Sequence, residues 1–510
     1  MERGVNMKHI LDSVHGTIDI PKHYCDKIID TCYFQRLRRI EQNSCRSVFP
    51  SARHDRFIHS LGVYHLGRKI ADSIVGKCGP EGSNILPEKY ETIIETYKMA
   101  CLLHDVGHTP FSHTFEDYFN KDAVLIELKQ IIGNDRFKND IEKAKSNAAS
   151  HETISAYVAL KVFGETLKEF QIDLELLARM IMGYKYLDEN DDNKPIGSFE
   201  NVMIELIHGD IIDADGLDYV CRDVWAGGYK NFSIDLNRLI YAIEVERDQN
   251  GKYSVLYSSK ALNEIETVLN VKNFQYLYVI KHHKVLLEQH ILEEAMKSAA
   301  CYHLGLPGEQ KDDQRDNALR TLCDFRVFEE AKVLPKSQYK LYRPVDDDFV
   351  ALMKLCDSEE FYIKQWLSRS FNNTPLWKSK LEYFNIFRPV FKTLSKTSIE
   401  KVHTLLNSDI CIRYMCDNLS ICPKDIIILN VESKVRSLDE KKIKVRLNDN
   451  VLPYSELNHD MFSVVSTKLP FCYIYVNLSR FGNGDKAEQI KMVISQLKEF
   501  ILYSLKDEWN

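Results

Sequence analysis

The chain has 510 residues, 44% of them hydrophobic, and its formal net charge is −7. A chain of this length can bury a large core in more than one structural unit, because a domain usually takes about 100 to 200 residues. The acidic balance excludes a general attraction to nucleic acid or to an anionic membrane, so any polyanion site must be local. We expect a globular protein for which nucleic-acid binding is not a main function.

The sequence also indicates a compartment. No stretch near the start combines basic residues, an apolar run and a small-residue cleavage site, and no apolar run approaches the roughly 20 residues that cross a bilayer. The 13 cysteines are scattered and no two stand in C-x-x-C spacing, which argues against a disulfide framework and against a thiolate zinc site. We therefore expect a soluble protein with reduced thiols in the cytoplasm, or in the nucleus of a eukaryote, with no membrane partner.

Apolar residues recur at helical spacing up to about residue 410. From His59 to Ile70 they follow at intervals of 4, 3 and 4 residues, and the stretch from Ile93 to His104 repeats this pattern. The periodicity predicts two helices whose buried faces carry His59 and His104. The glycines and the proline of residues 76–82 predict the break between these helices.

Beyond residue 410 the pattern changes. Residues 426–429 form a continuous apolar run, residues 443–447 alternate, and residues 473–476 are rich in strand formers. Residues 490–501 return to helical spacing. The sequence thus predicts a mainly α protein that ends in a small mixed α/β lobe, in which the three strand-like stretches form a sheet.

The adjacent pair His104 and Asp105 is the most informative feature of the chain. A buried carboxylate is costly without a partner, and a divalent cation would serve both side chains. His59 and the carboxylates Asp213 and Asp215 complete a ligand set of imidazoles and carboxylates, which favours iron, manganese or zinc over magnesium or calcium. The absence of cysteine argues against a purely structural zinc. The alternative is that His59 and His104 are core histidines that are hydrogen-bonded to neighbours.

Further imidazoles and a carboxylate follow close by in the sequence. His108, His113 and Glu116 can position a water molecule and protonate a leaving oxygen near a metal, as general acid–base catalysis requires. His151 adds another imidazole. The alternative for each is a supporting hydrogen bond to a metal ligand.

These motifs resemble the HD phosphohydrolase superfamily, which is named after a doublet of the type of His104 and Asp105. Within it, the sequence from about residue 8 to 300 is similar to the deoxynucleoside triphosphate triphosphohydrolases, including the type with a sterile-alpha-motif domain and its bacterial relatives, although the similarity includes no such domain. The runs that carry the resemblance are residues 12–16, 29–38, 48–50, 56–63 and 104–108. The resemblance implies an HD-domain helical core as the catalytic domain in residues 1–330, and a C-terminal helical and α/β lobe in residues 331–510.

The resemblance also implies a role for each motif residue. The metal ligands would be His59, His104, Asp105 and Asp215, with Asp213 as the fallback for Asp215. His113 would donate the proton to the departing sugar oxygen, with Glu116 tuning it, while His108 and His151 face the phosphates. The substrate would be bound by Arg56 at the triphosphate, by Gln42 and Asp223 at the sugar hydroxyl, and by Tyr219 at the sugar ring.

A regulatory site is implied as well. The relatives read an activating guanine nucleotide at a subunit interface with residues at the places of Asp30, Gln35 and Arg38, so the resemblance implies a homo-oligomer, either dimer or tetramer. The same spacing also fits an ordinary helix surface with salt bridges.

Three positions depart from the family pattern. Gly216 stands where the relatives have a phosphate-binding lysine, Asn273 where they have an arginine, and Lys281 where they have a sugar-stacking tyrosine. Losing cations from a triphosphate pocket weakens binding unless others replace them. We expect Lys281 to contact the substrate, and Lys272 and Lys284 to help restore the charge.

The leading hypothesis is therefore metal-dependent hydrolysis of deoxynucleoside triphosphates to deoxynucleoside and inorganic triphosphate, with iron, manganese or zinc at the HD site and Mg²⁺ accompanying the nucleotide. One rival is a nuclease or phosphodiesterase of the same superfamily, which would need a basic groove for a polymeric strand. The other is a weakly catalytic nucleotide sensor in antiviral defence by nucleotide depletion.

Overall fold

A computed structural model describes residues 6–46, 48–83, 85–144, 148–187, 194–209, 212–229, 233–306, 310–356, 360–390, 396–431, 443–448, 450–457 and 470–505. The chain divides into two compact units. The first comprises Met1–Gln275, Met296–Asp357 and Leu438–His459, and the second comprises Tyr276–Ala295, Ser358–Ser437 and Asp460–Asn510. These units do not follow the expected division at residue 330, and that division into functional domains stays a prediction.

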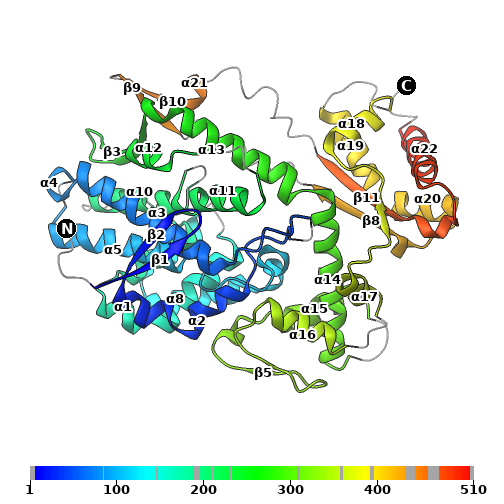
Figure 1. Ribbon diagram of the computed structural model, residues 1–510, viewed down its shortest axis with the longest axis horizontal. Coiled ribbons are helices and arrows are strands. Elements are labelled where there is room, and N and C mark those ends of the chain that lie inside the picture. The colour runs from blue at the N-terminus through cyan, green and yellow to red at the C-terminus, as the bar shows by residue number, and fades with distance from the viewer. Residues whose placement is uncertain are drawn as a thin grey trace. The chain divides into compact units, whose positions relative to one another are not determined.

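The first unit is built mainly from helices (Figure 1). Its long helices are α3 (Arg56–Lys77), α5 (Pro87–Leu103), α6 (Lys121–Ile132), α8 (Ser150–Glu169), α10 (Lys194–Ile207), α11 (Ala214–Ala226), α13 (Leu262–Phe274) and α15 (Asp312–Leu322). Shorter ones are α1 (Lys22–Tyr24), η1 (Cys25–Ile29), α2 (Cys32–Gln35), η2 (Arg36–Arg39), α4 (Pro80–Ser83), η3 (Ser112–Tyr118), α7 (Asp135–Lys143), α9 (Leu174–Met182), α12 (Leu236–Tyr241), η4 (Ser259–Ala261), η6 (Phe325–Phe328), α16 (Asp346–Lys354) and α21 (Tyr454–Leu457). The prediction of a mainly α protein is confirmed.

Helix α3 is the central element of the first unit. It packs against α5, α11 and the strand β2, and it is buried over most of its length because small and apolar residues line several of its sides. His59 is buried on this helix, as are Ile93 and Tyr97 on α5. The helical spacing in the sequence therefore predicted the buried faces of both helices, and the chain leaves α3 at Lys77, within the expected break.

A β-hairpin precedes these helices, although helical spacing dominates the sequence pattern up to about residue 410. Strand β1 (Met7–Asp12) pairs antiparallel with β2 (Gly16–Pro21), with Asp12 opposite Gly16. The Asp12 carboxylate accepts hydrogen bonds from the backbone N–H groups of Val14 and His15 at 2.9 and 2.7 Å, and Gly16 has a φ of 76°. An aspartate that closes a turn and a glycine in the left-handed region are a hairpin signal that the helical reading missed.

The second unit is the mixed α/β lobe. Its sheet has the order β7 (Asn373–Pro375), β11 (Phe471–Asn477), β8 (Ile426–Val431), with both pairs antiparallel. Its helices include α17 (Phe361–Ser368), α18 (Lys380–Phe387), α19 (Lys396–Leu406), α20 (Asp409–Leu419), η7 (Pro423–Asp425), η9 (Leu478–Phe481) and α22 (Lys486–Ser504). Every residue of β11 is buried, so this strand forms the centre of the core. Helix α14 (His283–His303) and η5 (Gln275–Ile280) contribute residues to both units.

One expected strand belongs elsewhere. Strand β9 (Lys444–Leu447), predicted to join the C-terminal sheet, lies in a four-stranded sheet of the first unit with the order β10 (Asn450–Pro453), β9, β4 (Tyr253–Ser258), β3 (Ile243–Arg247). It pairs parallel with β4, with Val445 opposite Tyr257. Val445 is fully buried in this sheet. The alternation of polar and apolar residues predicts a strand, but it cannot show which sheet buries the apolar face of that strand. A separate short hairpin, β5 (Lys332–Val333) and β6 (Lys340–Leu341), completes the first unit.

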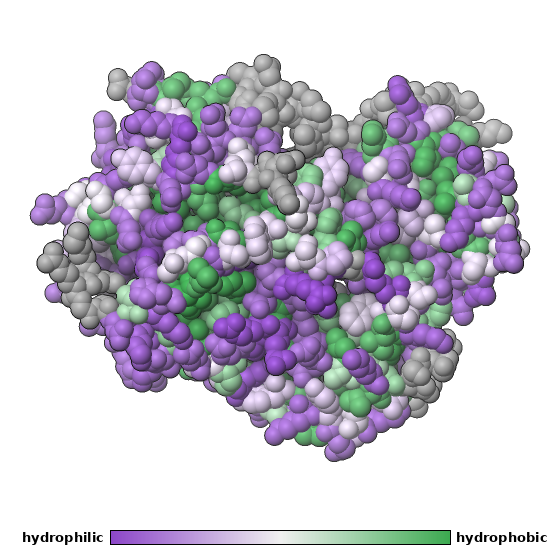
Figure 2. All heavy atoms as spheres, viewed as in Figure 1, coloured by the Kyte–Doolittle hydropathy of each residue, from purple (hydrophilic) through white to green (hydrophobic). Residues whose placement is uncertain are grey.

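Hydrophilic residues cover most of the face seen in Figure 2, with hydrophobic residues gathered in smaller areas between them. Among the residues that the structure describes, none of the helices combines the length and the apolar character needed to pass through a bilayer.

Candidate metal centre and active site

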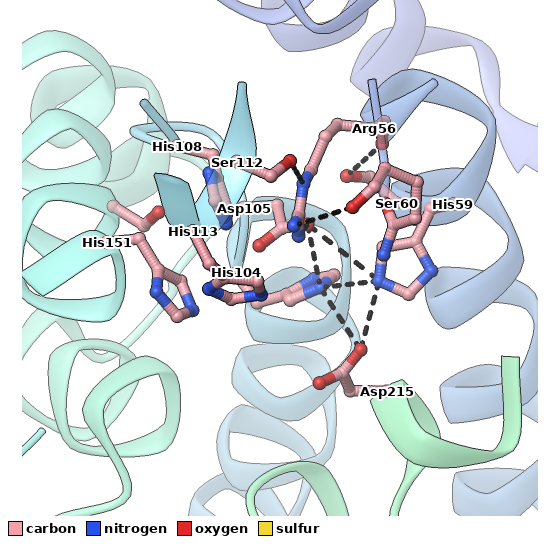
Figure 3. A network of polar contacts seen from close by, with 12 residues as sticks. Arg56, His59, Ser60, His104, Asp105, His108, Ser112, His113, His151 and Asp215 are labelled. Carbon is pink, nitrogen blue, oxygen red and sulfur yellow. Dashed lines mark hydrogen bonds and ion pairs between the residues drawn. The ribbon is translucent and has the colours of Figure 1, made fainter. Parts of the chain in front are cut away.

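Three helices of the first unit bring the predicted ligands together (Figure 3). His59 lies in the first turn of α3, which begins where the Asp55 side chain accepts a hydrogen bond from the Ile58 N–H at 3.0 Å. His104 follows directly after α5, and Asp105 comes next. Asp215 lies in the first turn of α11, whose N-cap is Asp213.

The side-chain atoms of these residues converge on one point. Nε2 of His59 lies 3.3 Å from Nε2 of His104 and 3.0 Å from an oxygen of Asp215. Oδ2 of Asp105 lies 3.8 Å from Nε2 of His59 and 3.6 Å from Nε2 of His104. His59, His104 and Asp105 form a group that could hold a metal ion. Asp213 instead accepts a hydrogen bond from the Gly216 N–H, so Asp215 is the carboxylate that faces His59.

The other ring nitrogen of each histidine has a hydrogen-bond acceptor. Nδ1 of His59 lies 2.7 Å from an oxygen of Asp218, and Nδ1 of His104 lies 3.0 Å from the carbonyl oxygen of Cys101. Because both partners accept hydrogen bonds, each Nδ1 carries a proton, and each ring presents a lone pair at Nε2 when that ring is neutral. When both rings are neutral, their facing lone pairs repel unless a cation lies between them, so the donor set fits a metal ion.

Burial and charge act together on these groups. Burial alone would lower the pKa of His59, but hydrogen bonds with Asp215 and Asp218 raise it to about 10, so a metal ion that binds Nε2 displaces a proton from this ring. Burial would raise the pKa of the Asp105 carboxyl, but Arg56 and the surrounding histidines hold it well below its usual value. The site therefore keeps its carboxylates ionised and attracts positive charge.

A second group of side chains lies beside the first: His108, His113 and His151 also form a group that could hold an ion. Glu116 joins two of them, because its oxygens lie 2.8 Å from Nδ1 of His113 and 2.8 Å from Nδ1 of His151. The His108 and His151 rings stack with their centroids 4.5 Å apart. Burial lowers the pKa of His151, but Glu116 outweighs burial and raises it.

The loop that carries His108 and His113 depends on a close approach to α8. A Cβ atom on Gly107 would lie 2.6 Å from the backbone of Ile154 and Ser155, so only glycine lets this loop lie against the helix that carries His151. Further along, Phe111 and Ser112 have φ values of 53° and 51°, a left-handed conformation that costs non-glycine residues roughly 1 to 3 kcal/mol. Asp346 accepts a hydrogen bond from the Phe111 N–H at 2.6 Å and so supports this conformation.

Arg56 connects the metal centre to this loop. Its guanidinium lies 2.6 Å from Asp105 Oδ2 and donates to Ser112 Oγ at 3.0 Å and to the carbonyl oxygen of Gln42 at 3.2 Å. Arg56 and Gln42 are both buried. The two predicted substrate residues therefore lie next to each other and next to a predicted ligand.

Helix α11 carries the other predicted sugar contacts. Asp223 lies 2.7 Å from Nε2 of His54, and Tyr219 lies on the same helix with the Lys272 ammonium 5.3 Å from its ring centroid. A Cβ atom on Gly216 would lie 2.6 Å from Lys272 Nζ. Helix α13 thus places a lysine ammonium beside Gly216, the position at which the family that the sequence resembles has a lysine. Lys281 belongs to the second unit, so its contact with the substrate stays a prediction.

The three residues expected to read a guanine nucleotide lie close together. Gln35 donates to the Ile29 carbonyl at 2.9 Å and accepts from Arg38 at 2.8 Å. The Arg38 guanidinium lies over the Phe57 ring, 3.5 Å from its centroid. Asp30 pairs with Lys8 of β1 at 3.4 Å. These contacts fit a nucleotide site and an ordinary helix surface with salt bridges equally well. The second interpretation is the alternative that the spacing in the sequence left open.

The groups that support His59 were not predicted from the sequence. Asp218, Arg222 and Asp12 form a buried chain of ion pairs that ends on Nδ1 of His59. The spacing of Asp218 and Arg222, four residues apart on a predicted helix, is a signal for an ion pair. Nothing in the sequence shows that Asp12, about 200 residues earlier, joins them.

Residues 56–182, which carry His59, His104 and Asp105, match the family model described as HD domain. A solved structure of a phosphohydrolase from Bacteroides thetaiotaomicron has a TM-score of 0.58 and 20% sequence identity, covering 92% of this chain and 100% of that chain. At this identity the likeness concerns the fold alone.

Two curated relatives can be compared in sequence. An uncharacterized protein of Mycoplasma genitalium is 33% identical over 254 residues, which are 49% of this chain and 50% of that protein. A protein of Dictyostelium discoideum named deoxynucleoside triphosphate triphosphohydrolase SAMHD1 homolog is 28% identical over 278 residues, which are 54% of this chain and 46% of that protein. The chain thus spans about half the length of the curated relatives it matches.

Proposed function

We propose that the protein is a metal-dependent phosphohydrolase that converts deoxynucleoside triphosphates into deoxynucleoside and inorganic triphosphate. The observation that carries the proposal is the 3.3 Å approach of Nε2 of His59 to Nε2 of His104, with both lone pairs directed inward by acceptors at Nδ1. The proposed ligands are His59, His104, Asp105 and Asp215. Imidazole and carboxylate donors favour iron, manganese or zinc.

The charge around the centre supports a divalent ion. Four carboxylates and two guanidiniums are linked to it by ion pairs, which leaves a net charge of −2 when the imidazoles are neutral. These groups are Asp12, Asp105, Asp215 and Asp218 with Arg56 and Arg222. Uncompensated charge in a buried site is costly, and a divalent cation would balance this set. When bound, such a metal would lower the pKa of a water molecule and polarise a phosphoryl oxygen.

The remaining residues have distinct proposed tasks. His113, held by Glu116, gives a proton to the 5′ oxygen of the sugar as the bond between that oxygen and the α-phosphorus breaks, while the oxygen of water joins the phosphorus and that water releases a proton to solvent. Arg56, Lys272 and His151 oppose the negative charge of the triphosphate. His108 faces the phosphates as a neutral ring, because burial holds its pKa well below the usual value. Gln42, Asp223, Tyr219 and Lys281 bind the nucleoside.

The choice of substrate rests on three supports. The motif runs resemble deoxynucleoside triphosphate triphosphohydrolases, one relative at 28% identity carries that name, and the Lys272 ammonium lies beside Gly216. The last point favours an enzyme over a sensor, because a cation stands where the family pattern would otherwise have lost one.

The test is product identification. Each deoxynucleoside triphosphate, singly and in mixtures, is incubated with the full chain and Fe²⁺, Mn²⁺, Zn²⁺ or Mg²⁺, with His104→Ala as the matched inactive control. We expect equal amounts of deoxynucleoside and triphosphate. Cleavage of a single-stranded oligonucleotide without triphosphate release would identify a nuclease, and tight nucleotide binding without product would identify a sensor.

Regulation is part of the same proposal. Asp30, Gln35 and Arg38 are proposed to bind the base of a guanine nucleotide between subunits of a homo-oligomer. Adding GTP should then raise both the hydrolysis rate and the mass measured by light scattering. A rate and a mass that do not respond to GTP would remove this part and leave the hydrolase intact.

A further inference from the structure

A buried chain of charged side chains runs from the β1–β2 turn to the candidate metal centre. Asp12 ends β1 and lies 2.8 Å from Nη1 of Arg222. Arg222 in turn lies 2.8 Å from Asp218, one turn earlier on α11. Asp218 lies 2.7 Å from Nδ1 of His59. All four side chains are at most 2% exposed, so water does not compete for these contacts.

Asp218 is saturated with hydrogen-bond donors. Besides His59, it accepts from Nε and Nη2 of Arg222 at 2.8 and 2.9 Å and from Nε2 of His15 at 2.6 Å. A carboxylate has about four acceptor sites, and all four are used. Its orientation is therefore determined from three sides: by α3 through His59, by its own helix through Arg222, and by the hairpin turn through His15.

The packing leaves this carboxylate no room to move. A Cβ atom on Gly62, one turn after His59 on α3, would lie 1.9 Å from an oxygen of Asp218 and 2.5 Å from Nη2 of Arg222. The backbone of α3 thus passes directly over the ion pair. A carboxylate held in this way can accept a hydrogen bond from Nδ1 of His59 in only one orientation of the imidazole ring.

We propose that Asp218, held by Arg222 and Asp12, is a positioning residue that sets the tautomer and ring orientation of His59, and that the β1–β2 turn is thereby part of the metal site. This inference rests on the proposed metal centre. Carboxylates behind a ligating imidazole typically change metal affinity by about 10- to 100-fold. The hairpin contributes without touching the metal, because it fixes the guanidinium that fixes Asp218.

The test is titration of Mn²⁺ into the metal-free full chain in competition with a chromogenic chelator. Asp218→Asn keeps the shape of the side chain, but its NH₂ group cannot accept from His59, so we expect Mn²⁺ affinity to fall by about 10- to 100-fold. Asp12 contacts no predicted ligand, so Asp12→Asn should also lower Mn²⁺ affinity, but by a smaller factor than Asp218→Asn. If Asp218→Asn does not fold, Asp12→Asn decides the question.

Asp140→Asn is the matched control. Asp140 is a buried carboxylate of the same unit and pairs with the fully buried Arg179 at 2.8 Å, outside the metal centre. It should lower the melting temperature as Asp218→Asn does, while Mn²⁺ affinity stays within about twofold of the wild type. Equal Mn²⁺ affinity in wild type, Asp218→Asn and Asp12→Asn, or an equal loss in Asp140→Asn, overturns the positioning role alone. A wild-type chain that binds none of Mn²⁺, Fe²⁺ and Zn²⁺ overturns the proposed function as well.

Discussion

The Nε2 atoms of His59 and His104 face each other at 3.3 Å, although the two residues come from different helices. Nδ1 of His59 donates a hydrogen bond to Asp218, and Nδ1 of His104 donates one to the carbonyl oxygen of Cys101. The arrangement resembles a metal site in which the protein directs two lone pairs at one point. The first prediction tests this relationship.

His104→Ala should abolish both metal content and hydrolysis, because it removes one of the two inward lone pairs and leaves carboxylates around a gap. Treating the wild-type protein with a chelator should have the same effect on hydrolysis, and adding the metal back should restore it only in the wild type. Elemental analysis of the purified proteins measures the metal. A His104→Ala protein that retains wild-type metal would contradict the ligand assignment.

His113→Ala should keep the metal and slow turnover. His113 lies beside Glu116 in the second histidine group and not in the group of His59 and His104, so its proposed task is proton transfer, which contributes about 10²- to 10⁴-fold to a rate. Steady-state kinetics should therefore give a kcat lowered by such a factor, with an unchanged metal-to-protein ratio. If His113→Ala emptied the metal site, the proposed roles of the two groups would have to be exchanged.

Lys272→Ala should weaken substrate binding. A hydrogen bond between a lysine and a phosphate contributes about 1.5 to 3 kcal/mol, which corresponds to a rise in KM of about 10- to 150-fold. Lys185→Ala is the control, since Lys185 forms an exposed ion pair with Glu205. Michaelis–Menten kinetics on both variants distinguish a phosphate contact from a general loss of positive charge, which would affect the two equally.

Asp346 makes a pH-dependent contribution to stability. Burial, which outweighs its hydrogen bonds from the Phe111 and Glu41 N–H groups, raises its pKa from 3.8 to about 7. The folded protein thus holds a proton that the unfolded chain has lost between about pH 4 and pH 7. The free energy of unfolding should fall as pH rises through this window, by up to about 4 kcal/mol for this group.

Urea unfolding of wild type and Asp346→Asn across this pH range measures the effect. Asparagine does not titrate, so the stability advantage of the wild type over Asp346→Asn should shrink as pH rises from 4 to 7. Asp347→Asn is the control, because Asp347 is exposed and pairs with Arg39 at the surface. A wild-type advantage that is the same at pH 4 and pH 7 would show that Asp346 stays ionised throughout.

The sequence by itself indicated two buried helical faces and the kinds of donor atom in the candidate site. Helical spacing around His59 and His104 predicted that both lie on buried faces, because apolar periodicity reports burial directly, and the pair His104 and Asp105 predicted the type of ligand. Local patterns also predicted β8 and β11 of the C-terminal lobe, but not β7, and they assigned β9 to the wrong sheet.

Only the tertiary structure decided which distant residues meet. The resemblance named Asp215 as a ligand and kept Asp213 as a fallback, and the structure shows that Asp213 caps α11 while Asp215 faces His59. Lys272 came next to Gly216 because α13 packs against α11 through Val220, Val224 and Val271. The pairing of Arg222 with Asp12, and of β9 with β4, likewise joins segments about 200 residues apart. Contacts of this kind follow from how whole elements bury their surfaces together, which no local spacing records.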